Sequence, residues 1–202
     1  KQANELSGIN NICYIEDFKD VLSSIATKVD TFYINKNEHY RANSPVETRE
    51  DRFISWLLKK YPAHNVAKSN PILQRQRSIK HPYEIDQIKR ACEITEKGFN
   101  RVLKFIKPNI WEYEIEAEFI HEFINNSSKG FAYSPIIASG NDNNVLHYIK
   151  NNKQCKSGEL ILMDVGAEYG NYSSDMTRTV PVSGKFSKRQ KQVYNSVLRV
   201  KN

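Results

Sequence analysis

Between residues 82 and 180 the apolar residues change their spacing once along the chain. Up to residue 126 they recur every three or four positions, which predicts amphipathic helices. From residue 134 onward they tend to alternate with polar residues, which predicts half-buried strands. Helices followed by a run of antiparallel strands indicate an α+β fold, with a helical layer packed on a sheet.

Two long helices joined by a short, proline-containing loop are predicted first. Pro82 suits the first turn of a helix over residues 82–106, and Pro108 follows its end. The second helix is expected over residues 112–126. The expected buried face of the first helix comprises Ile85, Ile88, Ala91, Cys92, Thr95, Phe99, Val102 and Leu103, and that of the second comprises Tyr113, Ala117, Ile120 and Ile124.

The region before these helices has α/β character. Residues 31–35 are typical of a strand, and residues 47–61 of an amphipathic helix that ends before Pro62. A polar, basic stretch, QRQRSIK, then precedes His81 and Pro82. We therefore expect two domains: 1–75, the C-terminal part of an α/β domain, and 76–202, the N-terminal half of a larger α+β domain.

Four strands are expected after the helices, at residues 134–137, 145–149, 160–165 and 172–180. A further helix begins near residue 187, and the sequence stops inside it. The chain also begins at Lys1 without an initiator methionine. Both features lead us to expect a part of a longer protein.

The last two predicted strands form a hairpin that carries two aspartates. With Tyr169 and Gly170 at the turn, Asp164 lies directly opposite Asp175, and opposed residues share one face with Cβ atoms ~4.5–5.5 Å apart. Two carboxylates that close repel each other unless a cation lies between them. Hard divalent cations prefer oxygen ligands, and two of them ~3.5–4 Å apart would fit. By spacing alone, an exposed hairpin whose aspartates are merely solvated or paired with lysine is the favoured explanation.

Three segments resemble known enzymes. The segment LMDVGAEYGNYSSDMTRTVPVSGKFSKRQKQVYNSVL is similar to the metal-binding segment of aminopeptidase P and prolidase, within the creatinase and methionine aminopeptidase superfamily. FAYSPIIASGNDNNVLHY resembles the part of that family that carries an active-site histidine, and RSIKHPYEIDQIKRACEITEKGF resembles the start of its catalytic domain. The resemblance is close over residues 76–202 and looser over residues 1–75.

The resemblance implies a fold and a set of site residues. The fold is the first half of a pita-bread catalytic domain, preceded by the end of a creatinase-like N-terminal domain. Asp164 and Asp175 fall on two of the family's metal ligands, for two divalent ions, usually manganese. His147 falls on the catalytic histidine, which also binds substrate, and Tyr133 on a tyrosine of the substrate cleft.

The implied activity is hydrolysis of the bond between an N-terminal residue and a following proline, by a hydroxide that two metals activate. The family's other ligands, one histidine and two glutamates, lie in a part of the domain that this sequence does not contain. We therefore expect the chain by itself to bind metal weakly and to be inactive. Two alternatives stay open: an Xaa-Pro dipeptidase (prolidase), and a non-catalytic pita-bread module that binds proteins.

Composition limits other functions. The formal charge is +7, but the basic residues are scattered and no nucleic-acid-binding motif accompanies them, so we expect no nucleic-acid partner. No apolar run is long enough to span a membrane, and the first residues lack the pattern of a secretory signal, so we expect neither a membrane span nor a signal. Three widely spaced cysteines predict free thiols and a cytoplasmic protein. The expected partner is a peptide with proline in second place, and the parent protein is expected to be a homo-oligomer.

One helical pair resembles a metal motif but favours a simpler interpretation. Glu118 and His121 are three positions apart on the second helix, like half of a di-iron site. Only one copy of the motif is present, in a helix that is rich in glutamate throughout. A solvated helix face is therefore the expected role of both residues.

Overall fold

The computed structural model describes residues 2–36 and 46–202, and the chain divides into two compact units, Lys1–Ile79 and Lys80–Asn202. The division falls a few residues after the predicted boundary, because helix α4 (Asn70–Ser78) runs through positions 75 and 76. That the two units correspond to the predicted domains of a longer protein stays a prediction.

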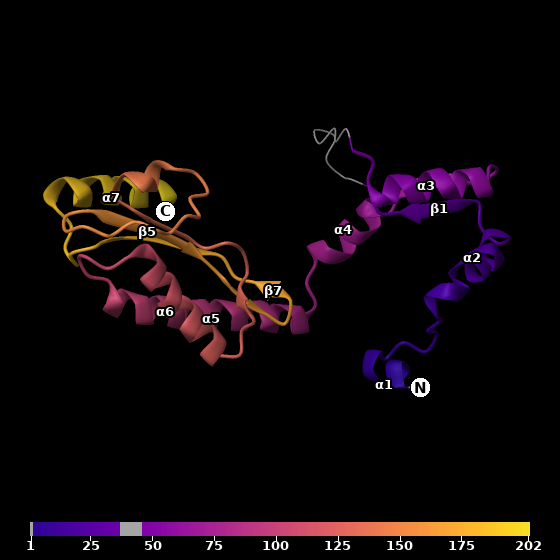
Figure 1. Cartoon of the computed structure of the whole chain (residues 1–202), viewed down its shortest axis with the longest axis horizontal. Helices are drawn as coiled ribbons and strands as arrows, with labels where there is room; N and C mark the ends of the chain where they lie inside the picture. The colour runs from indigo at the N-terminus through magenta and orange to yellow at the C-terminus, as the bar shows by residue number, and fades with distance from the viewer. Residues whose placement is uncertain (1, 37–45) are drawn as a thin grey trace. The chain divides into compact units, whose positions relative to one another are not determined.

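The first unit contains a parallel pair of strands joined by a helix (Figure 1). Its elements are α1 (Gln2–Ser7), a 3-10 turn (Ile15–Asp17), α2 (Phe18–Ala26), β1 (Thr31–Ile34), α3 (Arg49–Lys60), β2 (Asn65–Lys68) and α4. The predicted strand at 31–35 and helix at 47–61 are confirmed. Helix α3 begins where it does because Thr48 caps it: the Thr48 hydroxyl accepts from the Asp51 amide, and the Asp51 carboxylate accepts from the Thr48 amide.

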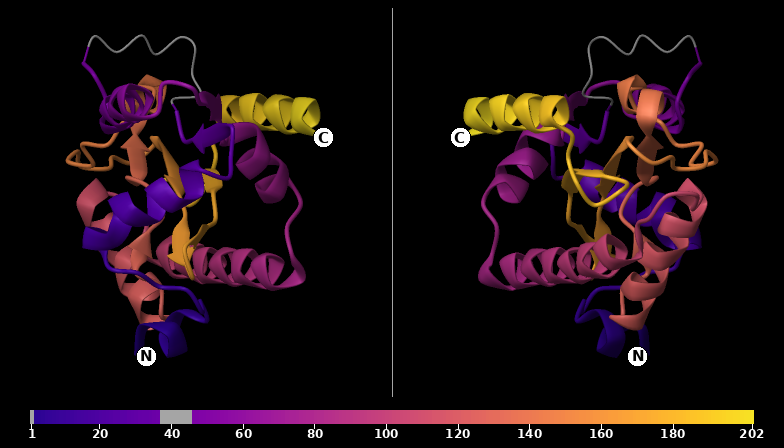
Figure 2. Two further views of the ribbon diagram at one scale, coloured as in Figure 1. Left: turned by 90° about the vertical axis from the view of Figure 1, so that its right-hand side faces the viewer. Right: turned by 90° about the vertical axis from the view of Figure 1, so that its left-hand side faces the viewer.

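The second unit combines helices with antiparallel strands in two three-stranded sheets, as the change of period predicts for a mixed fold. Its helices are α5 (Pro82–Phe105), α6 (Glu112–Asn125) and α7 (Lys188–Lys201). Its strands are β3 (Gly130–Phe131), β4 (Ile136–Ser139), β5 (Leu160–Val165), β6 (Ala167–Tyr169), β7 (Tyr172–Ser173) and β8 (Met176–Pro181). Figures 1 and 2 show α5 and α6 along one side of the strands and α7 on the other side.

The core of this unit lies between α5, α6 and the sheet. Phe99 of α5 packs edge-on against Phe119 of α6, with ring centroids 5.1 Å apart. Phe119 and Phe123 are both fully buried. From the sheet, Ile161, Met163 and Val165 point into the same core at alternating positions of β5. The face of the hairpin that carries Ile161, Met163 and Val165 is therefore the one that packs on the helices.

The predicted buried face of α6 is wrong. Tyr113 and Ile124 are exposed, and the helix instead buries Ile115, Phe119 and Phe123. Apolar residues occupy most of the circumference of this helix, so spacing alone does not select one face. The larger aromatic rings fill the core, and this rotation also places the carboxylate of Glu112 inside the unit.

The hairpin turns one residue later than predicted. Its two central residues are Gly170 and Asn171, with φ of 58° and 66°, because a two-residue hairpin turn of this kind needs positive φ at both positions. Tyr169 instead pairs with Tyr172. The register therefore shifts by two residues, and Asp164 lies opposite Thr177 rather than opposite Asp175.

The predicted strand at residues 145–149 is also wrong. A 3-10 turn (Gly140–Asn144) follows β4, and the chain then continues as a turn and an irregular loop. Strand β4 pairs directly with β5, and β5 with β8, so the sheet has no place for a strand between them. Over residues 2–36 and 46–202, no helix is both long and apolar enough to cross a membrane.

Candidate active site

The structure brings all four predicted site residues to one open pocket. Tyr133, His147, Asp164 and Asp175 line a cavity of about 450 Å³ on the polar face of the sheet, together with Ser134, Ile136 and Ile149. Asp164 comes from β5, and Asp175 from the break between β7 and β8. Tyr133 lies in the segment before β4, and His147 in the loop after it. The roles of these four residues stay predictions.

The two aspartates converge on a single hydroxyl. The Tyr133 hydroxyl lies 2.7 Å from Oδ1 of Asp164 and 3.1 Å from Oδ1 of Asp175. Because the hydroxyl carries one proton, it can donate fully to only one carboxylate at a time. Two acidic side chains thus face the same small volume, although they do not oppose each other across the hairpin.

A close approach of two strands lies beneath this convergence. Gly166 sits between β5 and β6, and a Cβ placed on it would lie 1.8 Å from the carbonyl oxygen of Ser174 and 3.1 Å from the Tyr133 ring. Only glycine leaves that space open. Gly166 therefore allows the Ser174 backbone, which leads directly into Asp175, to lie against the segment that follows Asp164.

A buried hydroxyl pair fixes the backbone at the same place. Thr95 of α5 and Ser174 are both buried, and their hydroxyl oxygens are 2.6 Å apart. Both oxygens also accept from the amide of Ala167, at 2.9 and 3.0 Å. Helix α5 is therefore tied to the strand break that presents Asp175.

The environment of Tyr133 keeps its hydroxyl protonated. Burial of the ring, followed by the hydrogen bond to Asp164 and its negative charge, raises the pKa of Tyr133 well above the usual value. Asp175 contributes in the same direction through its own hydrogen bond and charge. Tyr133 is therefore a proton donor toward the two carboxylates across the physiological pH range.

The loop that carries His147 is anchored next to that residue. His147 is exposed and has φ of 53°, in the left-handed region that a side chain other than glycine seldom occupies. Its neighbour Tyr148 is 7% exposed and donates through its hydroxyl to Glu112. Burial, followed by this hydrogen bond, raises the pKa of Tyr148.

The donor set suits a hard divalent cation. Asp164 and Asp175 offer carboxylate oxygens that face one volume, which magnesium- and manganese-type ions prefer. Within the described part of the chain, no group of three or more His, Cys, Asp or Glu side chains is arranged to hold a metal ion. The two carboxylates by themselves thus offer fewer ligands than such an ion takes.

The sequence interpretation did not identify the residues that support the site. Glu112, Thr95 and Ser174 are buried polar residues whose partners lie far away in sequence. The hairpin pattern puts Gly166 on the polar face but does not reveal its close contact with Ser174. A signal was available only for Gly166, because a glycine inside a strand pattern often marks a close backbone approach.

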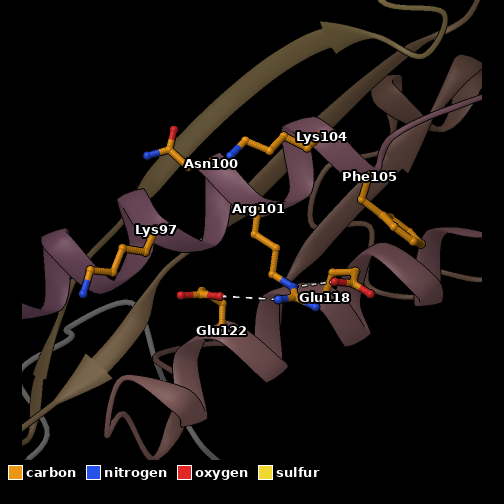
Figure 3. Close-up of a pocket in the computed structure, with 7 residues that line it drawn as sticks. All are labelled: Lys97, Asn100, Arg101, Lys104, Phe105, Glu118 and Glu122. Carbon is orange, nitrogen blue, oxygen red and sulfur yellow. Dashed lines mark hydrogen bonds and ion pairs between the residues drawn. The ribbon is translucent and has the colours of Figure 1, made fainter.

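A second cleft, between α5 and α6, is occupied by ion pairs (Figure 3). Arg101 of α5 reaches across it to Glu118 and Glu122 of α6. His121 is exposed, as expected for a solvated helix face, whereas Glu118 forms an ion pair with Arg101 that the sequence did not predict. Neither arrangement resembles half of a di-iron site.

Comparisons with known proteins place this arrangement in a family. The sequence pattern of metallopeptidase family M24 matches residues 86–202. The chain is 32% identical over 202 residues to a Xaa-Pro aminopeptidase of Haemophilus influenzae and 30% identical to that of Escherichia coli. These matches cover 98% and 97% of this chain but only 44% and 45% of the relatives, so the chain spans less than half of their length.

Solved structures agree in fold. A variant of Escherichia coli aminopeptidase P in complex with substrate has a TM-score of 0.85 at 30% identity, and proline aminopeptidase P II from Yersinia pestis has 0.84 at 28%. Each comparison covers 98% of this chain and 45% of the solved one. The predicted α+β fold is confirmed, and it matches the fold of aminopeptidase P structures. The chain belongs to metallopeptidase family M24.

Proposed function

We propose that this chain supplies the first two metal-binding carboxylates and the substrate-binding edge of an Xaa-Pro aminopeptidase. The observation that carries the proposal is the convergence of Asp164 and Asp175 on the hydroxyl of Tyr133, within 2.7 and 3.1 Å. The resemblance of the chain to Xaa-Pro aminopeptidases over nearly its full length supports the same activity for the parent protein.

Each site residue has a role that its position supports. Asp164 and Asp175 would bind two divalent ions, most simply Mn²⁺, which activate water and polarise the scissile carbonyl when they are bound. His147, exposed at the rim of the same pocket, would donate a hydrogen bond to the substrate carbonyl, where a preorganised donor favours the transition state. Tyr133, protonated beside both carboxylates, would hold their orientation and contact the substrate.

The small number of ligands leads to a specific expectation for the metal affinity and activity of the chain by itself. Two carboxylates offer at most four oxygens, whereas two hard cations need about six ligands each. We therefore propose that the 202-residue chain binds Mn²⁺ weakly and does not hydrolyse peptides. Turnover of a Pro-containing tripeptide at the rate of a full-length relative would contradict this part of the proposal.

A metal titration tests the site directly. Adding MnCl₂ to the isotope-labelled chain should broaden the NMR signals of residues around Asp164 and Asp175 before those of the rest of the second unit. Asp164→Asn or Asp175→Asn should weaken that effect by at least about tenfold, because each removes a charged ligand. Asp86→Asn, at an exposed aspartate in the second turn of α5, serves as the matched control. Broadening that is identical in all variants would exclude this metal site.

Two alternative functions, a prolidase and a non-catalytic binding module, must be tested on the full-length parent protein. Cleavage of a tripeptide with proline in second place, without cleavage of the corresponding dipeptide, would support an aminopeptidase over a prolidase. Partner binding that survives Asp175→Asn, with no metal detected in the purified protein, would instead support the non-catalytic module. We also propose that the parent protein is a homo-oligomer in the reducing cytoplasm. A reducing location fits the three free thiols, of which Cys13 and Cys92 are exposed.

A further inference from the structure

The most heavily bonded buried charge in the second unit is Glu112, in the first turn of α6. Its side chain is fully buried and accepts four hydrogen bonds. The donors are the amide and hydroxyl of Ser139, both at 2.7 Å, the hydroxyl of Tyr148 at 2.8 Å and the amide of Lys153 at 3.0 Å. Burying a carboxylate is costly unless its oxygens are satisfied in this way.

These donors come from both ends and the middle of one loop. Ser139 ends β4 and Lys153 begins the return of the chain, so residues 140–152 form a loop whose ends meet at Glu112. The backbone reinforces this closure, because the amide of Glu112 donates to the Lys153 carbonyl at 2.9 Å. The third attachment, Tyr148, follows His147 directly.

The hydrogen bond from Tyr148 to Glu112 restricts the position of the neighbouring residue, His147. Tyr148 points inward to Glu112 and is buried, whereas His147 is exposed and lines the pocket of Asp164. His147 also adopts a left-handed backbone conformation, which is unfavourable for a residue with a side chain and persists only when its surroundings fix it. The bond from Tyr148 to Glu112 is one such constraint.

We propose that Glu112 is a positioning residue, which holds the loop 140–152 so that His147 faces the two aspartates. The inference rests on the proposed function, since it assigns Glu112 a role through His147. Glu112 does not line the pocket and touches neither aspartate. Its removal should therefore release His147 while leaving the carboxylate pair in place.

Hydrogen exchange and histidine NMR on the 202-residue chain test the proposal without metal or activity. Glu112→Gln keeps the size of the side chain but places N–H donors against the donors of the loop. We expect amide exchange in residues 140–152 to accelerate at least about tenfold, with exchange in β5 and α5 changed less than twofold. The imidazole signals of His147 should shift toward their unfolded positions, while those of the other four histidines stay unchanged.

Two further variants separate positioning from general destabilisation. Tyr148→Phe removes only the hydroxyl and should move the His147 signals in the same direction, to a smaller extent. Glu118→Gln, on the same helix but paired with Arg101, should leave both the loop and His147 unchanged. Uniformly faster exchange throughout the second unit, or unchanged His147 signals in Glu112→Gln, would overturn the proposal.

The MnCl₂ titration keeps this inference distinct from the proposed function. Glu112→Gln should bind Mn²⁺ at Asp164 and Asp175 as the unaltered chain does, while His147 is released. If Mn²⁺ fails to bind any variant, the metal site is wrong, yet the exchange and histidine results still decide whether Glu112 positions the loop. If Glu112→Gln abolishes Mn²⁺ binding, Glu112 supports the carboxylates themselves, and the positioning role is refuted.

Discussion

Gly166→Ala should destabilise the second unit through one contact. The added Cβ would lie 1.8 Å from the Ser174 carbonyl oxygen, whereas ordinary contacts begin near 3.4 Å, so the strands must separate by about 1.6 Å. Overpacking of this kind costs about 1–3 kcal/mol, and the upper value applies because the obstacle is backbone. Alanine also restricts the unfolded chain, which stabilises by about 0.4–1 kcal/mol. The net loss is therefore about 2 kcal/mol.

Urea unfolding, followed by the fluorescence of a tryptophan in the second unit, measures this loss of stability. The chain has two tryptophans, and Trp56→Phe leaves Trp111 as the fluorescent reporter of the second unit. In that background Gly166→Ala should lower the free energy of unfolding by about 2 kcal/mol, or Tm by about 4 °C or more. Weaker Mn²⁺ binding should accompany the loss, because the displaced Ser174 backbone carries Asp175.

Gly158→Ala is the matched control. Gly158 has φ of 84°, and a Cβ added there would have no neighbour within 4 Å, so alanine meets conformational strain but no clash. Its cost, about 1–2 kcal/mol before the same unfolded-state offset, should come without any change in Mn²⁺ binding. If Gly166→Ala were as stable as the unaltered chain and bound Mn²⁺ equally well, the close approach beneath the two aspartates would be refuted.

Three other predictions concern the same unit. Thr95→Val and Ser174→Ala should each lower the free energy of unfolding by about 1–3 kcal/mol. Their double-mutant cycle should give a coupling energy of at least about 0.5 kcal/mol, because the two hydroxyls bond to each other. Losses that simply add would contradict this bond. Phe119→Ala should cost about 3–5 kcal/mol by urea unfolding, since the ring is fully buried, and a loss under about 1 kcal/mol would contradict its central place in the core. Burial raises the pKa of Cys155 to about 11, so the folded protein keeps the thiol proton to a higher pH than the unfolded chain does. The free energy of unfolding should therefore fall as the pH rises from about 9 to 11. Cys155→Ser should remove this fall, whereas Cys92→Ser, at an exposed thiol, should not.

The helices were predictable because their ends carry local signals. Pro82 and the acidic residue Glu84 mark the start of α5, and the structure begins the helix at Pro82, with the Glu84 carboxylate accepting from the His81 amide. Pro62 follows α3 in the same way. These signals act within one turn of helix, so a sequence contains all that is needed to recognise them.

The loop around His147 could not be predicted for the opposite reason. Its apolar residues, Val145, Tyr148 and Ile149 among them, resemble a short strand, but β4 and β5 pair directly and leave no place for a strand between them. Glu112, which lies 27 positions before Ser139, is one of the residues that fix this loop, and it is buried because α6 turns a different face to the core from the predicted one. A long-range bond to a buried charge leaves no local pattern in the sequence.

The shared face of the two aspartates was predicted correctly from a register that was wrong. Side chains alternate along a strand with a period of two, so a register shifted by an even number of residues keeps every side chain on its face, whereas a shift of one would reverse them all. The turn at Gly170 and Asn171 displaced the pairing by two, and Asp175 therefore became a diagonal rather than a direct neighbour of Asp164. Diagonal neighbours are ~7–8 Å apart at their backbones, which is farther than the direct pairing implied. The Tyr133 hydroxyl, within hydrogen-bond distance of both carboxylates, shows that the side chains close that gap, so the acidic pair depends on the face and not on the exact partner.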